Sequence, residues 1–311
     1  MTVVVLGDAN VDMEIRLPQP DIDRAHSNPD PRLLGGGSAA NTAAALGRLG
    51  VECKFVGVVG SDSFGRHATE SLAEAGVDVS GVENTRDSPT VTVITVVPVD
   101  GERLIYVWPP TGGAHAELSA KATTGALKSA DWLHVSGICL RVSPARESIL
   151  AAMKQSRAAG VPVSLDLNLR LENWGWDGGF REVVEEAVSY SDVIMGSAMD
   201  EVVPLAGVDD PTQAAAIVGG DGRLVIARLG AGGVVSWSPE GATSVPSFGV
   251  VVADTVGAGD AHNAGFIAAR LSGAEVGEAL RWGNAVAALT VSRHGARSTP
   301  SIAEVEALLA R

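Results

Sequence analysis

Short runs of apolar residues alternate along the chain with longer segments in which apolar residues recur every three to four positions. The short runs have the length of strands and show no polar alternation, which is typical of strands that are covered on both faces. They lie at residues 3–7, 54–59, 132–136, 162–166 and 193–195. Helical spacing predicts helices at residues 39–49, 65–75, 145–159 and 180–190. This alternation predicts an α/β fold with a mostly parallel central sheet and helices on both of its sides.

Two stretches interrupt the alternation. Residues 90–97 and 103–108 are β-rich runs joined by Asp100 and Gly101, which is typical of a hairpin because Gly readily adopts positive φ. Residues 13–17 and the proline-rich residues 18–31 form a second excursion, which we expect to be irregular. Together the segments 12–34 and 88–112 predict a small β lid. Without an internal repeat or a low-complexity linker, residues 1–311 are expected to form one domain.

Composition narrows the classes of partner. The chain of 311 residues has a formal net charge of -14, which argues against nucleic acid and anionic membranes as partners, since both attract clustered Lys and Arg. Apolar runs fall short of the roughly 18 residues that a membrane helix needs. The first residues show no signal-peptide pattern, so we expect a cytoplasmic protein. Cys53 and Cys139 have no metal-ligand spacing, and we expect inert core thiols.

The most informative segment reads Asp-Thr-Val-Gly-Ala-Gly-Asp at residues 254–260 and precedes a predicted helix. The small residues Gly257, Ala258 and Gly259 allow a ligand to approach the backbone, and N–H groups at a helix start bind anions. Asp260 falls in the first turn, where the helix dipole favours the ionised carboxylate. A weak base of this kind suffices for phosphoryl transfer through a loose transition state. Spacing alone leaves a catalytic carboxylate and a plain helix cap equally open.

Three segments together resemble the ribokinase-like (PfkB-type) carbohydrate kinase family. Residues 254–260, with Asn263 and Gly265, resemble its C-terminal signature, and residues 35–41 before an Ala-rich helix resemble its N-terminal one. The segment between them, residues 56–65 with Gly76 and Val77, is similar as well. The resemblance covers nearly the whole chain. It implies a three-layer α/β/α fold and an ATP-dependent kinase that phosphorylates a hydroxyl, expected to be a primary alcohol, of a sugar or sugar acid.

The resemblance also implies a role for individual residues. Asp260 would deprotonate the acceptor hydroxyl, and Gly257, Ala258 and Gly259 would supply the anion hole. The acceptor pocket is implied at Asn10, Asp12, Gly36, Gly37 and Asn41. Such carboxylate and amide groups can accept from and donate to several sugar hydroxyls. A polar strand end that faces water is the alternative for Asn10 and Asp12.

A further motif, Asp-Leu-Asn-Leu-Arg at residues 166–170, resembles the Asp-x-Asn-x-Arg stretch of members that act on keto-deoxy sugar acids and fructose. Arg170 would bind the acceptor or the transferring phosphate, because a planar guanidinium holds oxyanions in a bidentate manner. An ordinary surface Arg is the competing interpretation. ATP contacts are implied at Asn168, Arg228, Gly230, Gly233 and Asn284, of which residues 228–233 resemble the turn under the phosphates.

The same resemblance implies that metal ions take part. Mg²⁺ is expected to arrive with ATP and to keep several waters, and Glu201 matches the Glu of the family's Asn-x-x-Glu element. The chain departs from that element, because Ala198 stands at the Asn position, with Ser197 and Asp200 as candidate substitutes. A K⁺ ion is implied near Asp254, the Val256 carbonyl and residues 292–295.

Three other functions stay open at this point. A nucleoside kinase would need aromatic residues to stack on a base, and these make up 4% of the chain, with Trp108, Trp174 and Trp176 available. A non-catalytic nucleotide or sugar sensor is disfavoured by the intact residues 257–260. A dinucleotide-dependent oxidoreductase is disfavoured because residues 7–10 lack the Gly-x-Gly-x-x-Gly turn. Exposed edges of a β lid favour pairing with a second subunit, so we expect a homodimer.

Overall fold

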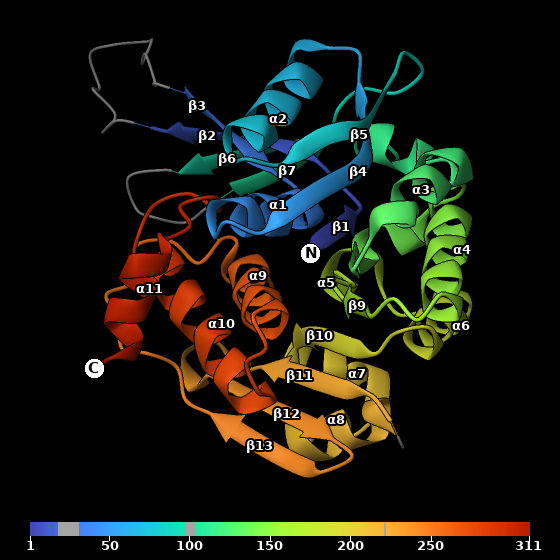
Figure 1. Cartoon of the computed structure of the whole chain (residues 1–311). Coiled ribbons are helices and arrows are strands. Elements are labelled where there is room, and N and C mark those ends of the chain that lie inside the picture. The colour runs from blue at the N-terminus through green and yellow to red at the C-terminus, as the bar shows by residue number, and fades with distance from the viewer. Residues whose placement is uncertain (18–30, 98–103, 221) are drawn as a thin grey trace.

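The computed structural model describes residues 1–17, 31–97, 104–220 and 222–311. Within them, a nine-stranded sheet runs through the molecule in the order β13-β12-β11-β10-β9-β8-β1-β4-β5 (Figure 1). Neighbours from β11 to β5 pair in parallel, and β12 and β13 are antiparallel. The strands are β1 (Thr2–Leu6), β4 (Glu52–Gly60), β5 (Asp78–Thr85), β8 (Trp132–Ser136), β9 (Val163–Asp166), β10 (Val193–Ser197), β11 (Leu224–Arg228), β12 (Val234–Ser238) and β13 (Gly241–Val245).

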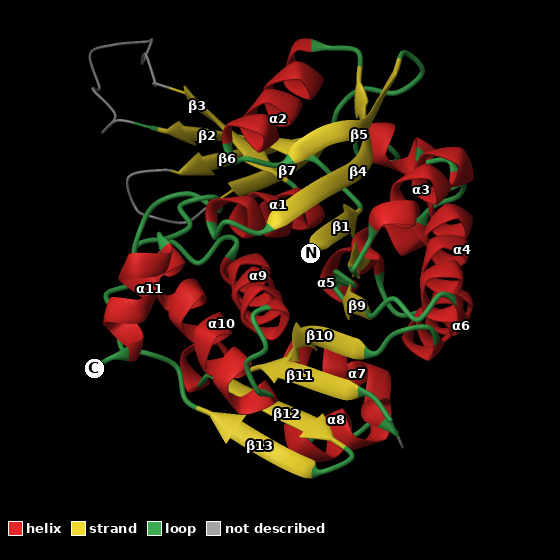
Figure 2. Cartoon of the chain, in the orientation of Figure 1, coloured by secondary structure: helices red, strands yellow, loops and turns green. Residues whose placement is uncertain are grey.

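Helices cover both faces of this sheet, as Figure 2 shows. Alternate residues of β1 enter two separate cores: Val3 and Val5 pack in one, Val4 and Leu6 in the other. The first core includes α1 (Ser38–Arg48), α9 (Ala258–Leu271), α10 (Val276–Val291) and α11 (Ile302–Leu309). The second includes α3 (Ala120–Ala126), α4 (Ala145–Ala158), α6 (Gly178–Ser189) and α8 (Pro211–Gly219). The remaining α-helices are α2 (Ser63–Glu74), α5 (Leu171–Trp174) and α7 (Val203–Ala206). The predicted three-layer fold is confirmed.

A smaller sheet of four strands has the order β3-β2-β6-β7 and fits the predicted lid (Figure 1). It contains β2 (Asn10–Arg16), β3 (Pro31–Gly36), β6 (Thr92–Val97) and β7 (Leu104–Trp108). The expected hairpin is present as the antiparallel pair of β6 and β7, while its turn at Asp100 and Gly101 lies outside the described residues. The expectation of an irregular stretch at 13–17 was wrong. β2 is regular because it pairs with β3 and also, in parallel, with β6 from far along the chain.

The parallel strands end at one edge of the large sheet, and ligands of open α/β sheets bind at this edge. The last residues of β9, β10 and β11 are Asp166, Ser197 and Arg228. β2 begins shortly after β1 ends, so the lid sheet rises from the same edge. In the part of the chain that the structure describes, no helix is both long and apolar enough to cross a bilayer.

Candidate active site

A hollow of about 620 Å³ lies at this edge, between the ends of β9 to β11 and the start of α9. It brings together predicted residues from separate motifs, among them Asp260, Arg170 and Glu201. The lining is Ser38, Asp166, Asn168, Arg170, Glu172, Ser197, Asp200, Glu201, Arg228, Thr255, Val256, Gly257, Ala258, Gly259 and Asp260. The predicted acceptor residues and Gly230, Gly233 and Asn284 do not line this hollow.

Asp260 is held by two side chains of α1. Its Oδ1 accepts a hydrogen bond from the Ser38 hydroxyl at 2.7 Å, and its Oδ2 accepts one from Nδ2 of Asn41 at 3.0 Å. The hydroxyl of Thr42 donates to the Asp260 carbonyl at 3.5 Å. The carboxyl therefore has a defined orientation on the wall of the hollow.

The protonation of Asp260 differs from the sequence expectation of a weak base. Burial raises its pKa to about 7, and the negative charge of Asp166 adds to this shift. The hydrogen bonds from Ser38 and Asn41 and the positive charge of Arg228 act in the opposite direction. Burial and a like charge thus outweigh the helix dipole, which places the pKa in the range that suits a general base near neutral pH.

The start of α9 forms one end of the hollow. Gly257 caps the helix with a φ of 78°, and a Cβ there would lie 2.7 Å from the Ala296 carbonyl oxygen, so only Gly fits. Gly257, Ala258 and Gly259 all line the hollow, as an anion hole requires. The N–H of Ala258 donates to the Thr255 carbonyl at 3.3 Å, and an incoming phosphate would have to replace that bond.

The predicted acceptor residues Asn10 and Asp12 belong to β2 and Gly36 belongs to β3, two strands of the lid sheet. Burial raises the pKa of Asp12, on β2, to about 6, while the Arg297 guanidinium lowers it. A Cβ on Gly36 would lie 2.5 Å from Oδ1 of Asp12, so the absence of a side chain lets that carboxyl pack directly against the backbone. The buried Oδ1 of Asn10 has no hydrogen-bond partner among the described residues. These groups form a second polar region next to the hollow.

Gly37 makes the turn from β3 into α1. Its φ of 93° is in the region that favours Gly, and a Cβ there would lie 2.6 Å from the Asp8 carbonyl oxygen. The Asp8 carboxylate in turn accepts from the N–H groups of Ser38 and Ala39 at 3.0 and 3.2 Å. The turn therefore fixes the first residues of α1, including Ser38, against the end of β1.

Arg228 ends β11 just before the turn that was expected under the ATP phosphates, and its contact with ATP stays a prediction. Its guanidinium reaches into the hollow, where it donates to Oδ1 of Asp166 at 2.7 Å and to Oδ1 of Asn263 at 2.6 Å. A Cβ on Gly259 would lie 3.2 Å from its Cζ, so the cation sits beside the start of α9. Asp166, Glu201 and Asp260 all raise its pKa.

The segment after β9 has an uncommon backbone. Asn168 and Arg170 have φ of 40° and 48°, values that non-Gly residues adopt only when surrounding contacts enforce them, and such residues cluster at functional sites. Nδ2 of Asn168 donates to the Ser136 hydroxyl at 3.3 Å, and Arg170 is exposed. In this conformation both residues line the hollow.

Glu201 lies in a single π-helical turn after β10 (Ala198–Val202). Its Oε1 accepts from the Leu169 N–H and its Oε2 from the Ser197 N–H, both at 2.7 Å. Burial and the charge of Asp166 raise its pKa. Ala198 is fully buried and adds no polar group, whereas the Ser197 hydroxyl donates to Asp200 at 2.7 Å. Ser197 and Asp200 therefore provide the polar groups at this corner.

The other predicted ATP residues lie away from the hollow. Gly230 belongs to a short 3₁₀ turn (Gly230–Gly232) between β11 and β12, which Gly233 follows. Nδ2 of Asn284 donates to the carbonyls of Val245 and Pro246 at 3.1 and 3.0 Å, and so ties α10 to the end of β13. Their contacts with adenine or phosphate stay predictions.

Asp254 bridges the loop before α9 and the loop after α10. Its Oδ1 accepts from the Val256 N–H and its Oδ2 from the Gly295 N–H, each at 3.2 Å. The two loops that were expected to hold K⁺ are therefore neighbours.

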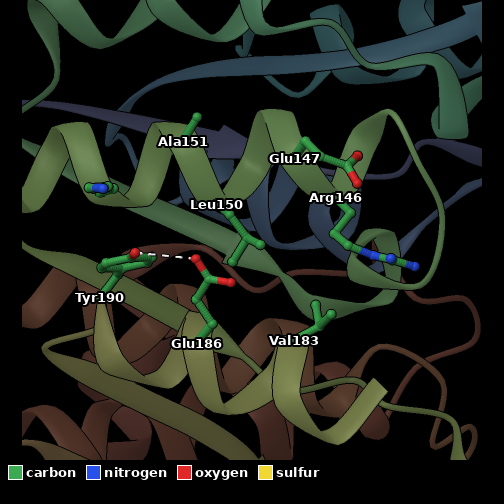
Figure 3. Close-up of a pocket in the computed structure, with 8 residues that line it drawn as sticks. Arg146, Glu147, Leu150, Ala151, Val183, Glu186 and Tyr190 are labelled. Carbon is green, nitrogen blue, oxygen red and sulfur yellow. Dashed lines mark hydrogen bonds between the residues drawn. The ribbon is translucent and has the colours of Figure 1, made fainter. Parts of the chain in front are cut away.

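A second hollow of about 390 Å³ lies between α4 and α6 (Figure 3). It shares no lining residue with the first one. Several of its polar groups already have partners: Tyr190 donates to Glu186 at 3.2 Å, and Arg146 donates to the Leu140 carbonyl at 2.9 Å. We assign no function to this groove. Cys53 and Cys139 are buried and free, as expected, and burial raises the pKa of both thiols.

Comparison with known proteins agrees with this geometry. A family model described as "pfkB family carbohydrate kinase" matches residues 1–303. The ATP-dependent ribose-1-phosphate kinase of Halopiger xanaduensis is 33% identical over 99% of this chain and 97% of its own length. The aminoimidazole riboside kinase of Salmonella typhimurium is 32% identical over 94% of this chain and 90% of its own. A fructokinase double mutant from Vibrio cholerae, solved with fructose, ADP and potassium, has a TM-score of 0.81 at 32% identity, covering 99% of this chain and 98% of that one.

The chain therefore belongs to the pfkB family of carbohydrate kinases. It is an ATP-dependent carbohydrate kinase, which confirms the class expected from the motifs.

Ser38 and Arg297 are among the site residues to which sequence reasoning assigned no role. Ser38 was part of the N-terminal signature, but its bond to Asp260 could not be read from it. Arg297, which contacts Asn41, lies in no motif. A lone Arg after Gly-Ala near the end of the chain carries no local signal of a buried site.

Proposed function

We propose that Asp260 takes the proton of the acceptor hydroxyl while the γ-phosphoryl group of ATP is transferred to that oxygen. The observation that supports this most is the Asp260 carboxyl, with a pKa raised to about 7, on the wall of a hollow that also contains the start of α9. The acceptor oxygen bonds to the γ-phosphorus as the bond to the bridging oxygen of ADP breaks. The proton passes to Asp260, and the first turn of α9 stabilises the charge on the phosphoryl oxygens.

Arg228 supports the same step with a fixed positive charge. Its guanidinium is fixed by Asp166 and Asn263 and lies beside Gly259, where the phosphoryl group would pass. A positive charge that is already positioned stabilises negative charge without reorganisation in the transition state. We propose that Arg228 contacts the transferred phosphoryl group and that the backbone of residues 230–233 contacts the remaining phosphates of ATP.

The acceptor would bind between Asp12, Asn41 and the orphaned Oδ1 of Asn10. The names of the relatives above mention fructose, ribose 1-phosphate and aminoimidazole riboside. Each of these compounds has several hydroxyls that such a pocket could bind. Sugars and sugar acids are the class that we propose. The nucleoside alternative rests on the riboside kinase and on Trp108, which is half exposed on the lid strand β7.

A coupled ADP-release assay over sugars, sugar acids, sugar phosphates and nucleosides tests this proposal, with Asp260→Asn as the control. We expect ADP release with at least one hydroxyl acceptor and a loss of several orders of magnitude in kcat for the variant, with little change in ATP affinity. Near-wild-type turnover by Asp260→Asn would remove the mechanism. ADP release with nucleosides alone would establish the alternative acceptor.

Magnesium would enter with the phosphates of ATP. Asp166, Asp200 and Glu201 present carboxylate oxygens, the donors that Mg²⁺ prefers, at the wall of the hollow. Among the described residues no group of three or more His, Cys, Asp or Glu could by itself hold a metal ion. Since both oxygens of Glu201 already accept backbone N–H groups, we propose that Glu201 contacts the ion through water, where Mg²⁺ would neutralise phosphate charge. Glu201→Gln should then raise the Mg²⁺ concentration for half-maximal activity, and an unchanged Mg²⁺ dependence would exclude this role.

A potassium ion is proposed between Asp254, the Val256 carbonyl and residues 292–295. The support is the contact of Asp254 with both loops and the potassium ion of the fructokinase structure. Substitution of Na⁺ for K⁺ should lower kcat, and equal rates in both salts would argue against the site.

A homodimer through the lid is the assembly that we propose. All five residues of β7 are at least half exposed, which leaves an apolar strand at the edge of the lid sheet. Ile105→Glu should convert a dimer into a monomer in analytical ultracentrifugation, and a wild-type monomer would disprove the proposal. The cytoplasmic location stays a prediction.

A further inference from the structure

Arg297 joins four elements around the acceptor side of the site. Its Nη2 donates to the Gly36 carbonyl of β3 at 2.8 Å, and its Nη1 donates to the Ser71 hydroxyl of α2 at 2.7 Å. Its Nε donates to Oδ1 of Asn41 on α1 at 3.1 Å. The fourth element is β2, whose Asp12 carboxylate opposes the lowering of the Arg297 pKa by burial.

The bond to Asn41 decides which way the amide faces. An amide side chain has an accepting oxygen at one end and a donating nitrogen at the other, and a guanidinium can only donate. With Nε of Arg297 on Oδ1, the nitrogen Nδ2 faces Asp260 and donates to its Oδ2 at 3.0 Å. If the amide turned over, its oxygen would face a carboxylate and its nitrogen a guanidinium, and both contacts would be repulsive.

We propose that Arg297 is a positioning residue that fixes the orientation of Asn41, and through it the catalytic carboxylate and the acceptor pocket. The proposal rests on the function proposed above. Arg297 stays outside the first hollow and acts on Asp260 through Asn41. The same guanidinium holds Gly36, which borders Asp12, so one side chain sets both the base and the pocket that receives the hydroxyl.

The surrounding charges support this arrangement. Arg297 faces the carboxylates of Asp12, Asp8 and Asp260, and Arg48 is the opposing cation. Burial lowers the pKa of Arg297 to about 10, so it stays charged at neutral pH. Asp260 itself faces Asp166 and Arg228 as well as the hydrogen bonds from α1. Loss of the Asn41 bond would remove one of the interactions that lower the pKa of Asp260.

The test compares Arg297→Met, Asn41→Ala and the double variant, with Arg281→Met as the matched control. Arg281 is an exposed arginine of α10 that donates to the Leu309 carbonyl at 2.8 Å and belongs to no proposed binding site. We expect Arg297→Met to lower kcat/KM for the acceptor about tenfold and to move the acid limb of the kcat profile to higher pH. KM for ATP should stay unchanged. The control should match the wild type in all three measurements.

The double variant decides whether Arg297 acts through Asn41. If Arg297 acts through Asn41, the double variant should lose no more than Asn41→Ala alone, within about twofold. Additive losses, or an unmoved acid limb in Arg297→Met, would overturn the proposal. If circular dichroism shows that Arg297→Met does not fold, Arg297→Lys replaces it. Lysine keeps the positive charge but cannot bind all three acceptors. Wild-type kinetics in Arg297→Lys would also overturn the proposal. The comparison of acceptor KM among the single and double variants tests the link between Arg297 and Asn41, whichever group is the base. The proposed function is tested separately, by Asp260→Asn, so a failure of one proposal can be told from a failure of the other.

Discussion

The Ser38 hydroxyl donates to Oδ1 of Asp260 at 2.7 Å, the geometry that an acceptor hydroxyl would need at the same oxygen. Ser38 therefore both stabilises the ionised base and competes with the acceptor for it. Ser38→Ala should raise the pKa of Asp260, because one interaction that favours the carboxylate is lost. We expect a shift of the acid limb of kcat/KM to higher pH and a change in kcat of less than about tenfold.

Ser63→Ala is the matched control for this prediction. Ser63 is the first residue of α2, as Ser38 is of α1, and it is exposed. Its pH profile should equal that of the wild type. An unchanged profile in Ser38→Ala would mean that the hydroxyl does not influence the base.

The pH dependence of the wild type follows from Asp260. Its carboxyl must be ionised to accept a proton, and its pKa is raised to about 7. Activity should therefore be half-maximal near pH 7 and fall as the pH is lowered, by about tenfold per unit well below that value. A kcat/KM profile between pH 5 and 9 measures this. A limb near pH 4 would show that burial does not raise the pKa in solution.

The same raised pKa predicts an effect on stability. The folded protein holds the Asp260 proton more tightly than the unfolded chain, whose pKa would be 3.8. The free energy of unfolding should thus fall as pH rises from about 4 to about 7, and stay lower above it. Asp260→Asn, which is neutral throughout, should raise Tm at pH 8 by a few degrees and leave Tm nearly unchanged at pH 4.

Asp209→Asn, a change at an exposed carboxylate, is the control for the stability measurement. It should alter Tm by a similar small amount at both pH values. If Asp260→Asn lowers Tm at pH 8, the ionised carboxylate stabilises the fold and the predicted sign is wrong.

Arg228 should contribute mainly to the chemical step. Arg228→Met removes a cation that Asp166 and Asn263 hold beside the start of α9. We expect kcat to fall by about a hundredfold, while KM for the acceptor changes little. Arg281→Met, at an exposed guanidinium that donates to the Leu309 carbonyl, should leave kcat unchanged. A rise in KM for ATP at unchanged kcat would instead assign Arg228 to nucleotide binding.

Arg170 distinguishes two classes of acceptor. The residue is exposed at the wall of the hollow and can reach a carboxylate of the acceptor or the transferring phosphate. Arg170→Ala should cost about tenfold or more in kcat/KM for acidic sugars and much less for neutral ones if it binds the carboxylate. Steady-state kinetics with a matched pair of a sugar and its acid measures this. Equal losses for both acceptors would point to the phosphate.

Local motifs made part of this site predictable. Residues 254–260 specify a Gly-rich turn and a helix start within a few residues, so the position of Asp260 could be anticipated. The pKa of Asp260 could not, because it depends on Asp166 and Arg228, which arrive from other strands. The dipole that favours the ionised form comes only from the helix that carries Asp260.

Non-local pairing explains the other differences. The strand β2 looked irregular because its partner β6 lies far along the chain. Arg228 was expected to contact the ATP phosphates because it precedes Gly230, but its bond to Asp166 on β9 could not be predicted from that motif. Arg297 shows the same limit, since its three acceptors come from β3, α1 and α2.

Asp260 and the side chains that hold it are far apart in the sequence. Asp260 follows Ser38 by 222 positions and Asn41 by 219, and Arg297 follows Asn41 by 256. A growing chain therefore contains the acceptor residues of β2, β3 and α1 long before it contains the base on α9. Turnover can begin only after α9 docks on α1, a long-range step of the kind that slows folding. The first appearance of ADP during refolding would time that docking event directly.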